Sequence, residues 1–206
     1  METAIYGGSF NPPHLGHLSA VKTVLSALEP DRLMIMPDCI APHKAMAAGT
    51  PSPEHRLAMC RLAFGSIPGV EISDLEIRRG GKSYTVDTLQ QLTALYPADR
   101  FWLVIGSDML ESFTVGWYRF EDILDMCTLT VISREKDDLA LLEEKAAVLR
   151  DRYSARIRII REHEPVVLSS SQVRQAIRSG DVKGLLDPAV AAYIEEHSLY
   201  EEGAVS

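Results

Sequence analysis

The sequence predicts an α/β fold in which helices cover both faces of a parallel β-sheet. Short apolar segments alternate with longer amphipathic segments along most of the chain, a pattern typical of β-α-β units. The short segments are apolar at nearly every position, as expected of strands that are buried on both faces. With 206 residues, the chain can bury a substantial core without a disulfide or a metal to hold it together.

Six short segments, rich in β-branched and aromatic residues, are the predicted strands. They cover residues 4–6, 33–36, 70–72, 101–105, 129–132 and 157–160. Parallel strands joined through helices need right-handed crossovers, which place the helices against the sheet. We therefore expect a Rossmann-like, doubly wound parallel sheet of five to six strands with helices on both faces.

The predicted helices lie between these strands. Residues 15–28 place leucine or valine at three- to four-residue spacing, and Pro30 ends the pattern. Ser52 and Pro53 are the N-cap and the first helical residue expected of the next helix. The same helical pattern returns at residues 85–95, 139–149, 170–177 and 188–197.

We predict one domain over residues 1–206, because no internal repeat, low-complexity tract or Pro/Gly/Ser-rich linker divides the chain. A small helical part follows the last strand, from about residue 165 to residue 206. It carries a Ser-Ser-Ser-x-x-Arg motif.

Charge and cysteine content narrow the class of protein. The formal net charge is −8, which argues against non-specific binding to nucleic acid or to an anionic membrane surface. The N-terminal residues resemble no secretory signal, and no apolar run is long enough to span a bilayer. Three cysteines without a C-x-x-C pair favour reduced thiols, so we expect a cytoplasmic protein without a cysteine metal site.

The first candidate site follows the first predicted strand, in the segment Gly7-Gly8-Ser9-Phe10-Asn11-Pro12-Pro13-His14-Leu15-Gly16-His17. In an open parallel sheet, ligands bind beyond the carboxyl ends of the strands. The two glycines allow the backbone to turn and to approach a ligand. His14 and His17 share one face of the following helix, whose N-terminus favours an anion such as a polyphosphate.

Other interpretations of this segment are weaker. Two histidines three residues apart could bind zinc, but the sequence offers no H-E-x-x-H motif and no obvious third ligand, so we predict no protein-held metal. Either histidine could instead be an ordinary surface residue. The combination of both with the glycines after the first strand favours the phosphate site.

A second candidate motif lies near the other end of the chain, at Leu168-Ser169-Ser170-Ser171-Gln172-Val173-Arg174. A serine run that begins a helix supplies an N-cap, hydroxyls and backbone N–H groups for phosphate. Arg174, one turn later, adds a fork-shaped cation suited to phosphate oxygens. By itself the motif could equally be a capped surface helix.

Together the two motifs resemble the nucleotidylyltransferase superfamily, whose adenylyltransferases carry H-x-G-H and I-S-S-T-x-x-R. Three further motifs resemble those of the bacterial nicotinate-nucleotide adenylyltransferases: residues 37–44, residues 83–89, and Gly106-Ser107-Asp108 followed by Phe113, Trp117 and Tyr118. The departures are mild: Ser9, Asn11 and Ser171 stand where the motifs have Thr, Asp and Thr.

The resemblance implies transfer of AMP from ATP to nicotinate mononucleotide, with Mg²⁺ bound to ATP. The acceptor phosphate is already largely deprotonated at neutral pH, so neither a general base nor a covalent intermediate is needed. The catalytic residues implied are His14, His17, Lys44 and Arg174. The ATP-binding residues implied are Gly8, Ser9, Phe10, His14, His17, Gly106, Asp108, Ser170, Ser171 and Arg174. The residues implied for nicotinate mononucleotide are Lys44, Thr85, Trp117 and Tyr118.

Several alternatives stay open from the sequence. A phosphopantetheine adenylyltransferase would share both phosphate motifs, and a catalytically silent nucleotide-binding module could keep the same scaffold. Gly81-Lys82-Ser83 imitates the end of a P-loop, but Glu76 stands where that motif needs glycine. Trp102 is expected in the core. The roles of His43 and Arg134, the preference for nicotinate over nicotinamide, and assembly into a homo-oligomer are undecided.

Overall fold

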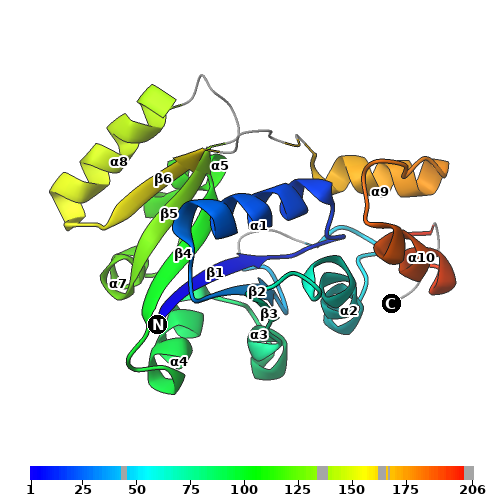
Figure 1. Ribbon diagram of the computed structural model, residues 1–206, viewed down its shortest axis with the longest axis horizontal. Helices are drawn as coiled ribbons and strands as arrows, with labels where there is room; N and C mark the ends of the chain where they lie inside the picture. Colours follow the sequence, from blue (N-terminus) through cyan, green and yellow to red (C-terminus); the bar gives the residue numbers. More distant parts are fainter. Residues whose placement is uncertain (43–45, 134–138, 162–165, 167, 202–206) are drawn as a thin grey trace.

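The computed structural model describes residues 1–42, 46–133, 139–161, 166 and 168–201. Its centre is a six-stranded sheet in the order β3-β2-β1-β4-β5-β6, with every neighbouring pair parallel. The strands are β1 (Glu2–Gly8), β2 (Arg32–Pro37), β3 (Val70–Ile72), β4 (Arg100–Gly106), β5 (Cys127–Ser133) and β6 (Ile157–Arg161). The doubly wound parallel sheet predicted from the sequence is confirmed (Figure 1).

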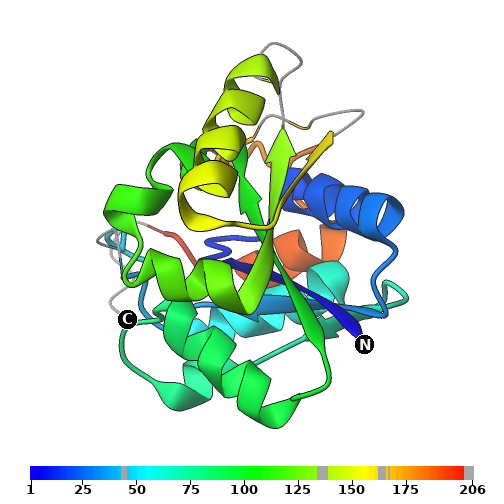
Figure 2. The same cartoon turned by 90° about the vertical axis from the view of Figure 1, so that its left-hand side faces the viewer.

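Helices cover both faces of the sheet (Figure 2). On one face, Ala4 and Tyr6 of β1 pack with Val21 of α1 and Cys60 of α2. On the other face, Ile5 belongs to a core shared with α4, α7 and α8, because successive side chains of a strand point to opposite faces. The helices of the two layers are α1 (Leu15–Leu28), α2 (Pro53–Phe64), α3 (Leu75–Arg79), α4 (Thr85–Leu95), α5 (Ser107–Glu111), α6 (Phe113–Gly116), α7 (Phe120–Met126) and α8 (Leu139–Tyr153).

Two C-terminal helices, α9 (Ser170–Ser179) and α10 (Pro188–Glu196), lie at one end of the molecule (Figure 1). They share a separate small core with α2, in which Met59 of α2 meets Val173 of α9 and Val190 of α10. Tyr200 closes this core from the C-terminal segment and is 2% exposed. The C-terminal part therefore packs against the helix that follows the second strand.

The predicted strands and long helices are confirmed, with the strands longer by one to two residues at most of their ends. The sequence analysis missed α3, α5, α6 and α7, which have 5, 5, 4 and 7 residues. So few residues do not show a helical repeat in the sequence. Trp102, expected in the core, is only half-buried: its indole N–H donates to Glu2 at 2.6 Å.

None of the described helices is long and apolar enough to cross a membrane. The parallel arrangement brings the carboxyl ends of all the strands to one edge of the sheet, as the paired residues Gly8–Pro37 and Gly106–Ile132 show. Ligands of open parallel sheets bind at this edge.

Candidate active site

A cavity of about 190 Å³ opens at the carboxyl edge of the sheet, between the ends of β1 and β4. Its walls come from seven segments of the chain: the end of β1, the loop after β2, α3, the start of α4, the end of β4, α5 and the segment after α6. The residues that line it include Gly8, Ser9, Asp38, Pro42, Glu76, Ser83, Thr85, Ile105, Met109 and Trp117. Of the predicted site residues, Gly8, Ser9, Thr85 and Trp117 lie here.

His14 and His17 lie together at the start of α1, with ring centroids 3.8 Å apart. The backbone N–H of His14 donates to Nδ1 of His17 at 3.2 Å. Because Nδ1 is therefore an acceptor, the proton of a neutral His17 ring is on Nε2, which becomes the hydrogen-bond donor. The predicted pair is confirmed as a neighbouring pair, and the fold fixes the tautomer of His17.

Gly16, between the two histidines, is required by close packing. A Cβ at this position would lie 2.9 Å from the carbonyl oxygen of Val166 and 3.1 Å from the ring of His14. The N–H of Leu15 also donates to the carbonyl of Leu185 at 2.9 Å. The start of α1 is thus held against two parts of the C-terminal region, which brings the two ends of the sequence together at the site.

The loop after β1 turns at Phe10, not at the glycines. Gly7 and Gly8 are the last residues of the strand, whereas Phe10 has a φ of 44°. Our expectation that Gly7 and Gly8 provide the tight turn is wrong for this reason. The Phe10 ring is 2% exposed and packs between His17, at 5.0 Å, and Phe64, at 6.0 Å between centroids. Anchoring by its ring compensates for a backbone conformation that is costly outside glycine.

Arg174 reaches this loop from α9. Its guanidinium donates to the carbonyl of Asn11 at 2.8 Å and to Oγ of Ser171 at 3.0 Å. Ser169 is the N-cap of α9 and accepts from the N–H of Gln172 at 3.2 Å, as the serine run predicts. The second sequence motif therefore meets the first, although Arg174 and Asn11 are 163 positions apart in the chain.

The other wall of the cavity carries the residues implied for nicotinate mononucleotide. Thr85 is the first residue of α4, so its backbone N–H points out of the helix N-terminus, where a carboxylate is stabilised. The Trp117 ring stacks at a tilt on Phe113, with centroids 4.9 Å apart, and lines the cavity. Tyr118 is 55% exposed and its ring lies 5.0 Å from that of Tyr84. Thr85 and Trp117 therefore line the cavity, whereas Tyr118 lies next to Trp117 in the chain and is not among the lining residues.

Glu76 is a buried carboxylate that the sequence analysis did not place in the site. Burial raises its pKa above the ordinary value, while hydrogen bonds from Thr88 and Ser83 act in the opposite direction. Thr88 donates to Glu76 at 2.6 Å and itself accepts from Arg79 at 2.9 Å. This network fixes the first turn of α4 on the floor of the cavity.

The sequence analysis also missed Arg56 of α2, whose side chain is 1% exposed and faces Asp38 at 2.9 Å. Arg56 lies on the same face of α2 as the buried Met59 and Cys60, but arginine is usually exposed, so nothing in the sequence indicated its burial. Its partner Asp38 lies in the segment 37–44, where we singled out only the proline, histidine and lysine positions.

Gly106 is the N-cap of α5, and Asp108 follows in the first turn with its side chain exposed. The N-cap position of this helix is thus taken by Gly106 and not by Asp108. Ser170 begins α9 beside Ser171. Lys44, His43 and Arg134 lie outside the residues that the structure describes, so their predicted or open roles are untested. His55 of α2 is half-buried and hydrogen-bonds Tyr193 through Nδ1 at 2.9 Å.

Within the described residues, no group of three or more His, Cys, Asp or Glu side chains is arranged to hold a metal ion. Asp38 and Glu76 do line the cavity, but Arg56 already neutralises the first and Thr88 donates to the second. Mg²⁺ prefers to keep several waters and to bind substrate phosphates. The residues present thus suit an ion that arrives on a triphosphate.

Comparison with known proteins shows the family of this chain. The cytidylyltransferase-like family model matches residues 5–176, and the chain belongs to that family of nucleotidyltransferases. Curated relatives narrow the family further. The chain is 37% identical to a probable nicotinate-nucleotide adenylyltransferase of Oceanobacillus iheyensis, over 98% of both chains. It is also 37% identical to one of Symbiobacterium thermophilum, over 97% of this chain and 95% of the relative.

Solved structures confirm the fold. The nicotinic acid mononucleotide adenylyltransferase of Plasmodium falciparum complexed with NaAD superimposes with a TM-score of 0.78 at 19% identity, covering 97% of each chain. A nicotinate-nucleotide adenylyltransferase structure from Vibrio parahaemolyticus superimposes with a TM-score of 0.67 at 22% identity, covering 98% and 97%. The resemblance inferred from the motifs is confirmed at the level of the family.

Proposed function

We propose that this protein is an adenylyltransferase that transfers AMP from ATP to nicotinate mononucleotide, producing nicotinate adenine dinucleotide and pyrophosphate. One observation carries the proposal: the His14–His17 pair and Arg174 meet the loop after β1, and the cavity lined by Thr85 and Trp117 opens beside that loop. An in-line transfer needs such an arrangement, with a phosphate site next to an acceptor pocket. The full-length relatives named for this activity support it.

The chemistry assigned to the protein is alignment and charge stabilisation. The phosphate of the acceptor has a second pKa of about 6 and attacks without a general base. His17 donates from Nε2 to the α-phosphate as charge builds there, because its Nδ1 is fixed as an acceptor. His14, Lys44 and Arg174 hold the remaining phosphates.

Hydroxyls and backbone groups complete the nucleotide side. Ser170 and Ser171 at the start of α9 add donors to the phosphates, while Gly8, Ser9 and Phe10 lie along the nucleotide through their backbone. We assign the ribose hydroxyls to Asp108 and the adenine side to Gly106. Mg²⁺ bound to the triphosphate supplies neutralisation of the departing pyrophosphate.

The acceptor end is assigned to the cavity that Thr85 and Trp117 line. Trp117 offers a flat aromatic face to the cationic pyridinium ring. The backbone N–H groups of Thr85 and Tyr118, with Lys44, bind the nicotinate carboxylate and the acceptor phosphate. Discrimination against nicotinamide then depends on donors at the start of α4, since an amide places an N–H₂ group where a carboxylate oxygen accepts.

The free cysteines support a reducing, cytoplasmic compartment. Cys39, Cys60 and Cys127 are all unbridged. Burial raises the pKa of the Cys127 thiol to about 12 and also raises that of Cys60, so neither forms a reactive thiolate at neutral pH. We therefore propose that Cys60 and Cys127 are packing residues of a cytoplasmic enzyme.

Pyrophosphate release tests the proposal. The purified protein is incubated with ATP and Mg²⁺ and, in separate reactions, nicotinate mononucleotide, nicotinamide mononucleotide or phosphopantetheine. We expect the highest kcat/KM with nicotinate mononucleotide. Faster release with phosphopantetheine would identify the other adenylyltransferase, and no release with any acceptor would favour a silent nucleotide-binding module.

A further inference from the structure

The buried guanidinium of Arg56 holds both loops that border the site. It donates to the carbonyl of Ser9 at 2.7 Å, to Oδ1 of Asp38 at 2.9 Å, to the carbonyl of Asp38 at 2.8 Å and to that of Cys39 at 3.0 Å. Three of these four acceptors are backbone carbonyls. The side chain therefore fixes the path of the main chain after β1 and after β2.

Asp38 completes the connection between the same two loops. Its backbone N–H donates to the carbonyl of Gly8 at 3.0 Å, and its Oδ2 accepts from the Ser9 hydroxyl at 2.7 Å. Arg56, Asp38 and Ser9 are thus hydrogen-bonded to one another and connect the loop after β1 to the loop after β2. Removing the guanidinium would leave a buried carboxylate and three carbonyls without their donor.

Arg174, from α9, holds the same loop two residues further along the chain. Arg56 binds the carbonyl of Ser9 and Arg174 binds the carbonyl of Asn11, so the two arginines flank Phe10. Phe10 has a φ of 44° and persists in this conformation because its surroundings fix it. Arg56 is one of the contacts that keep this turn directed toward His17.

The contacts of Arg56 extend to the acceptor end of the cavity. The N–H of Cys39, whose carbonyl Arg56 holds, donates to Oγ of Ser83 at 2.9 Å. The N–H of Ser83 donates to the carbonyl of Ile40 at 2.9 Å. Because Ser83 lies two residues before the start of α4, the loop after β2 connects the nucleotide side of the site to the Thr85 side.

We propose that Arg56 is a positioning residue for AMP transfer. It touches no substrate, since its side chain is 1% exposed, and it acts by setting the loop after β1 relative to the loop after β2. The inference rests on the proposed function. A buried ion pair is a weak source of stability compared with apolar packing of the same volume, so stability alone does not explain a guanidinium here. The planar, fork-shaped guanidinium can hold four acceptors in fixed positions, and this accounts for an arginine at this site.

The chain contains a matched control at the opposite edge of the sheet. Arg32 and Asp99 also form a pair at 2.9 Å, with side chains 16% and 8% exposed, but they join the amino ends of the strands. The experiment measures kcat, both KM values and Tm for Arg56→Lys and Arg32→Lys. We expect Arg56→Lys to lower kcat about 10- to 100-fold, because lysine cannot serve four acceptors and a small misplacement costs this much. Arg32→Lys should lower Tm and keep kcat within about twofold of wild type.

Chemical rescue separates positioning from folding. In Arg56→Ala, added guanidinium ion should refill the site and restore part of kcat, whereas urea and methylammonium at the same concentration should not. Arg56→Ala and Arg56→Lys are both assayed at a temperature where circular dichroism shows them folded. Guanidinium is present at millimolar concentration, far below the range that unfolds proteins.

Three results would overturn the proposal. The first is a kcat of Arg56→Lys within twofold of the Arg32→Lys value, and the second is a loss of rate that follows the loss of folded protein without rescue. The third is a failure of both Arg56 variants to fold, which would make Arg56 a stability residue. A wild-type protein that releases no pyrophosphate with nicotinate mononucleotide would instead refute the proposed function.

Discussion

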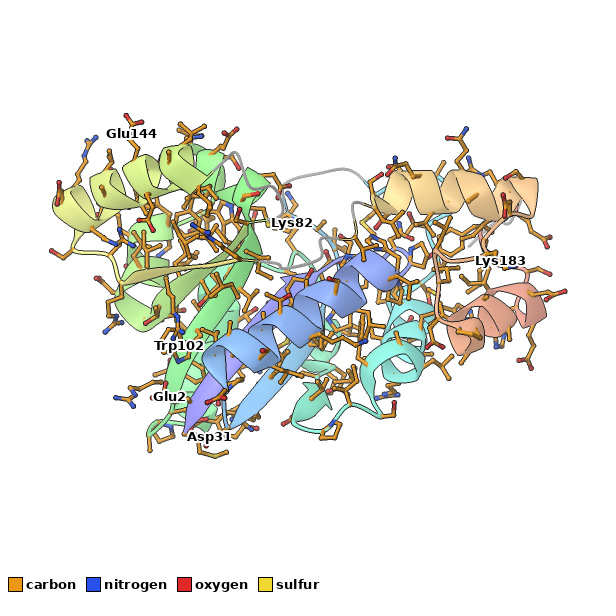
Figure 3. All side chains as sticks on the ribbon, turned by 45° about the horizontal axis from the view of Figure 1, so that its top comes forward. Glu2, Asp31, Lys82, Trp102, Glu144 and Lys183 are labelled. Atoms are coloured by element: carbon orange, nitrogen blue, oxygen red, sulfur yellow. The ribbon has the colours of Figure 1, made fainter. Side chains whose placement is uncertain are left out.

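Each of the two edges of the sheet carries one arginine–aspartate ion pair with the same N–O distance, but the two pairs contact different parts of the chain. Arg32 and Asp99 meet at 2.9 Å at the amino ends of the strands, and Arg56 and Asp38 meet at 2.9 Å at the carboxyl ends. The amino edge is the end near Glu2, Asp31 and Trp102 (Figure 3). What differs is what else each pair binds.

At the amino edge, the partners of the pair are side chains and the N-terminal ammonium group. Asp99 accepts from the Thr3 hydroxyl at 2.8 Å and from the N-terminal ammonium at 3.4 Å. The Arg32 guanidinium also stacks on the Tyr96 ring at 3.9 Å. These contacts tie β1, β2 and the loop between α4 and β4 together and involve no residue that lines the cavity, so we expect them to contribute to stability alone.

At the carboxyl edge, the pair binds backbone carbonyls of two loops. The lesson is that the same two side chains have different consequences according to whether they also bind side chains far from the cavity or backbone carbonyls of the loops that border it. Substitutions at one edge should therefore change the free energy of unfolding, and substitutions at the other should change the reaction rate. The predictions below test this division.

The largest effect is expected from His17→Ala at the carboxyl edge. Loss of a donor to the developing charge on phosphate should lower kcat/KM about 100-fold. His197, an exposed histidine of the C-terminal segment, provides the control, and His197→Ala should leave kcat/KM unchanged. Retention of more than about a tenth of wild-type kcat/KM in His17→Ala would refute its assignment.

Arg174→Ala should weaken the use of ATP by about tenfold in KM, because a charge-assisted contact to phosphate and the contact to Asn11 are both lost. Arg178, exposed in the last turn of the same helix, is the matched position. Steady-state kinetics with ATP varied are the measurement. An unchanged KM for ATP would remove Arg174 from the phosphate site.

The two tryptophans of the chain lie at opposite edges, and their substitution compares the edges directly. Trp117→Ala should raise the KM for nicotinate mononucleotide about fivefold with little change in that for ATP, since a cation–π contact is worth roughly 1 kcal/mol. Trp102→Phe should lower Tm slightly by removing the bond to Glu2 and leave both KM values unchanged. A larger rise in the KM for ATP in Trp117→Ala would relocate the acceptor pocket.

Asp99→Asn should change stability and its pH dependence without changing kcat. Burial acts to raise the pKa of Asp99, but hydrogen bonds from Thr3, the N-terminus and Arg32 outweigh it and leave the pKa lowered from 3.8. A lowered pKa stabilises the fold above the unfolded-state value, and this contribution is lost as the pH falls through the folded-state value. The Tm difference between wild type and Asp99→Asn should therefore be constant near neutral pH and shrink below about pH 4.

The smallest effect is expected from Tyr200→Phe. The Tyr200 hydroxyl is buried and has no hydrogen-bond partner among the residues that the structure describes, and burial raises its pKa. Deleting a buried hydroxyl that makes no bond should leave Tm unchanged or slightly higher. Tyr200→Ala is the contrasting variant, because it empties the small core around Met59 and Val173 and should lower Tm clearly. A marked loss of Tm in Tyr200→Phe would mean that the hydroxyl is bonded.

The sequence was sufficient for the parts of the site that depend on local pattern. Apolar runs and helix caps predict the sheet and the position of the phosphate loop, because burial and capping act over a few residues. The His14–His17 pair and the serine run before Arg174 were recognisable for the same reason.

What the sequence did not reveal depends on contacts between distant segments. Arg56 gains its role only when α2 lies behind two loops, and Glu76 is buried only because α3 packs beneath α4. The turn at Phe10 could not be predicted either, since neighbouring glycines are the usual place for a positive φ. Such features follow from the assembled fold.

The decisive measurement is a crystal structure of the protein with nicotinate mononucleotide and a non-hydrolysable ATP analogue. We predict the pyridine ring against Trp117, its carboxylate at the start of α4, and the α-phosphate within hydrogen-bond distance of Nε2 of His17. A contradicting result would be an empty cavity at the carboxyl edge of the sheet, with the mononucleotide bound elsewhere, for example in the pocket beside α1 that Lys22 and Arg161 line.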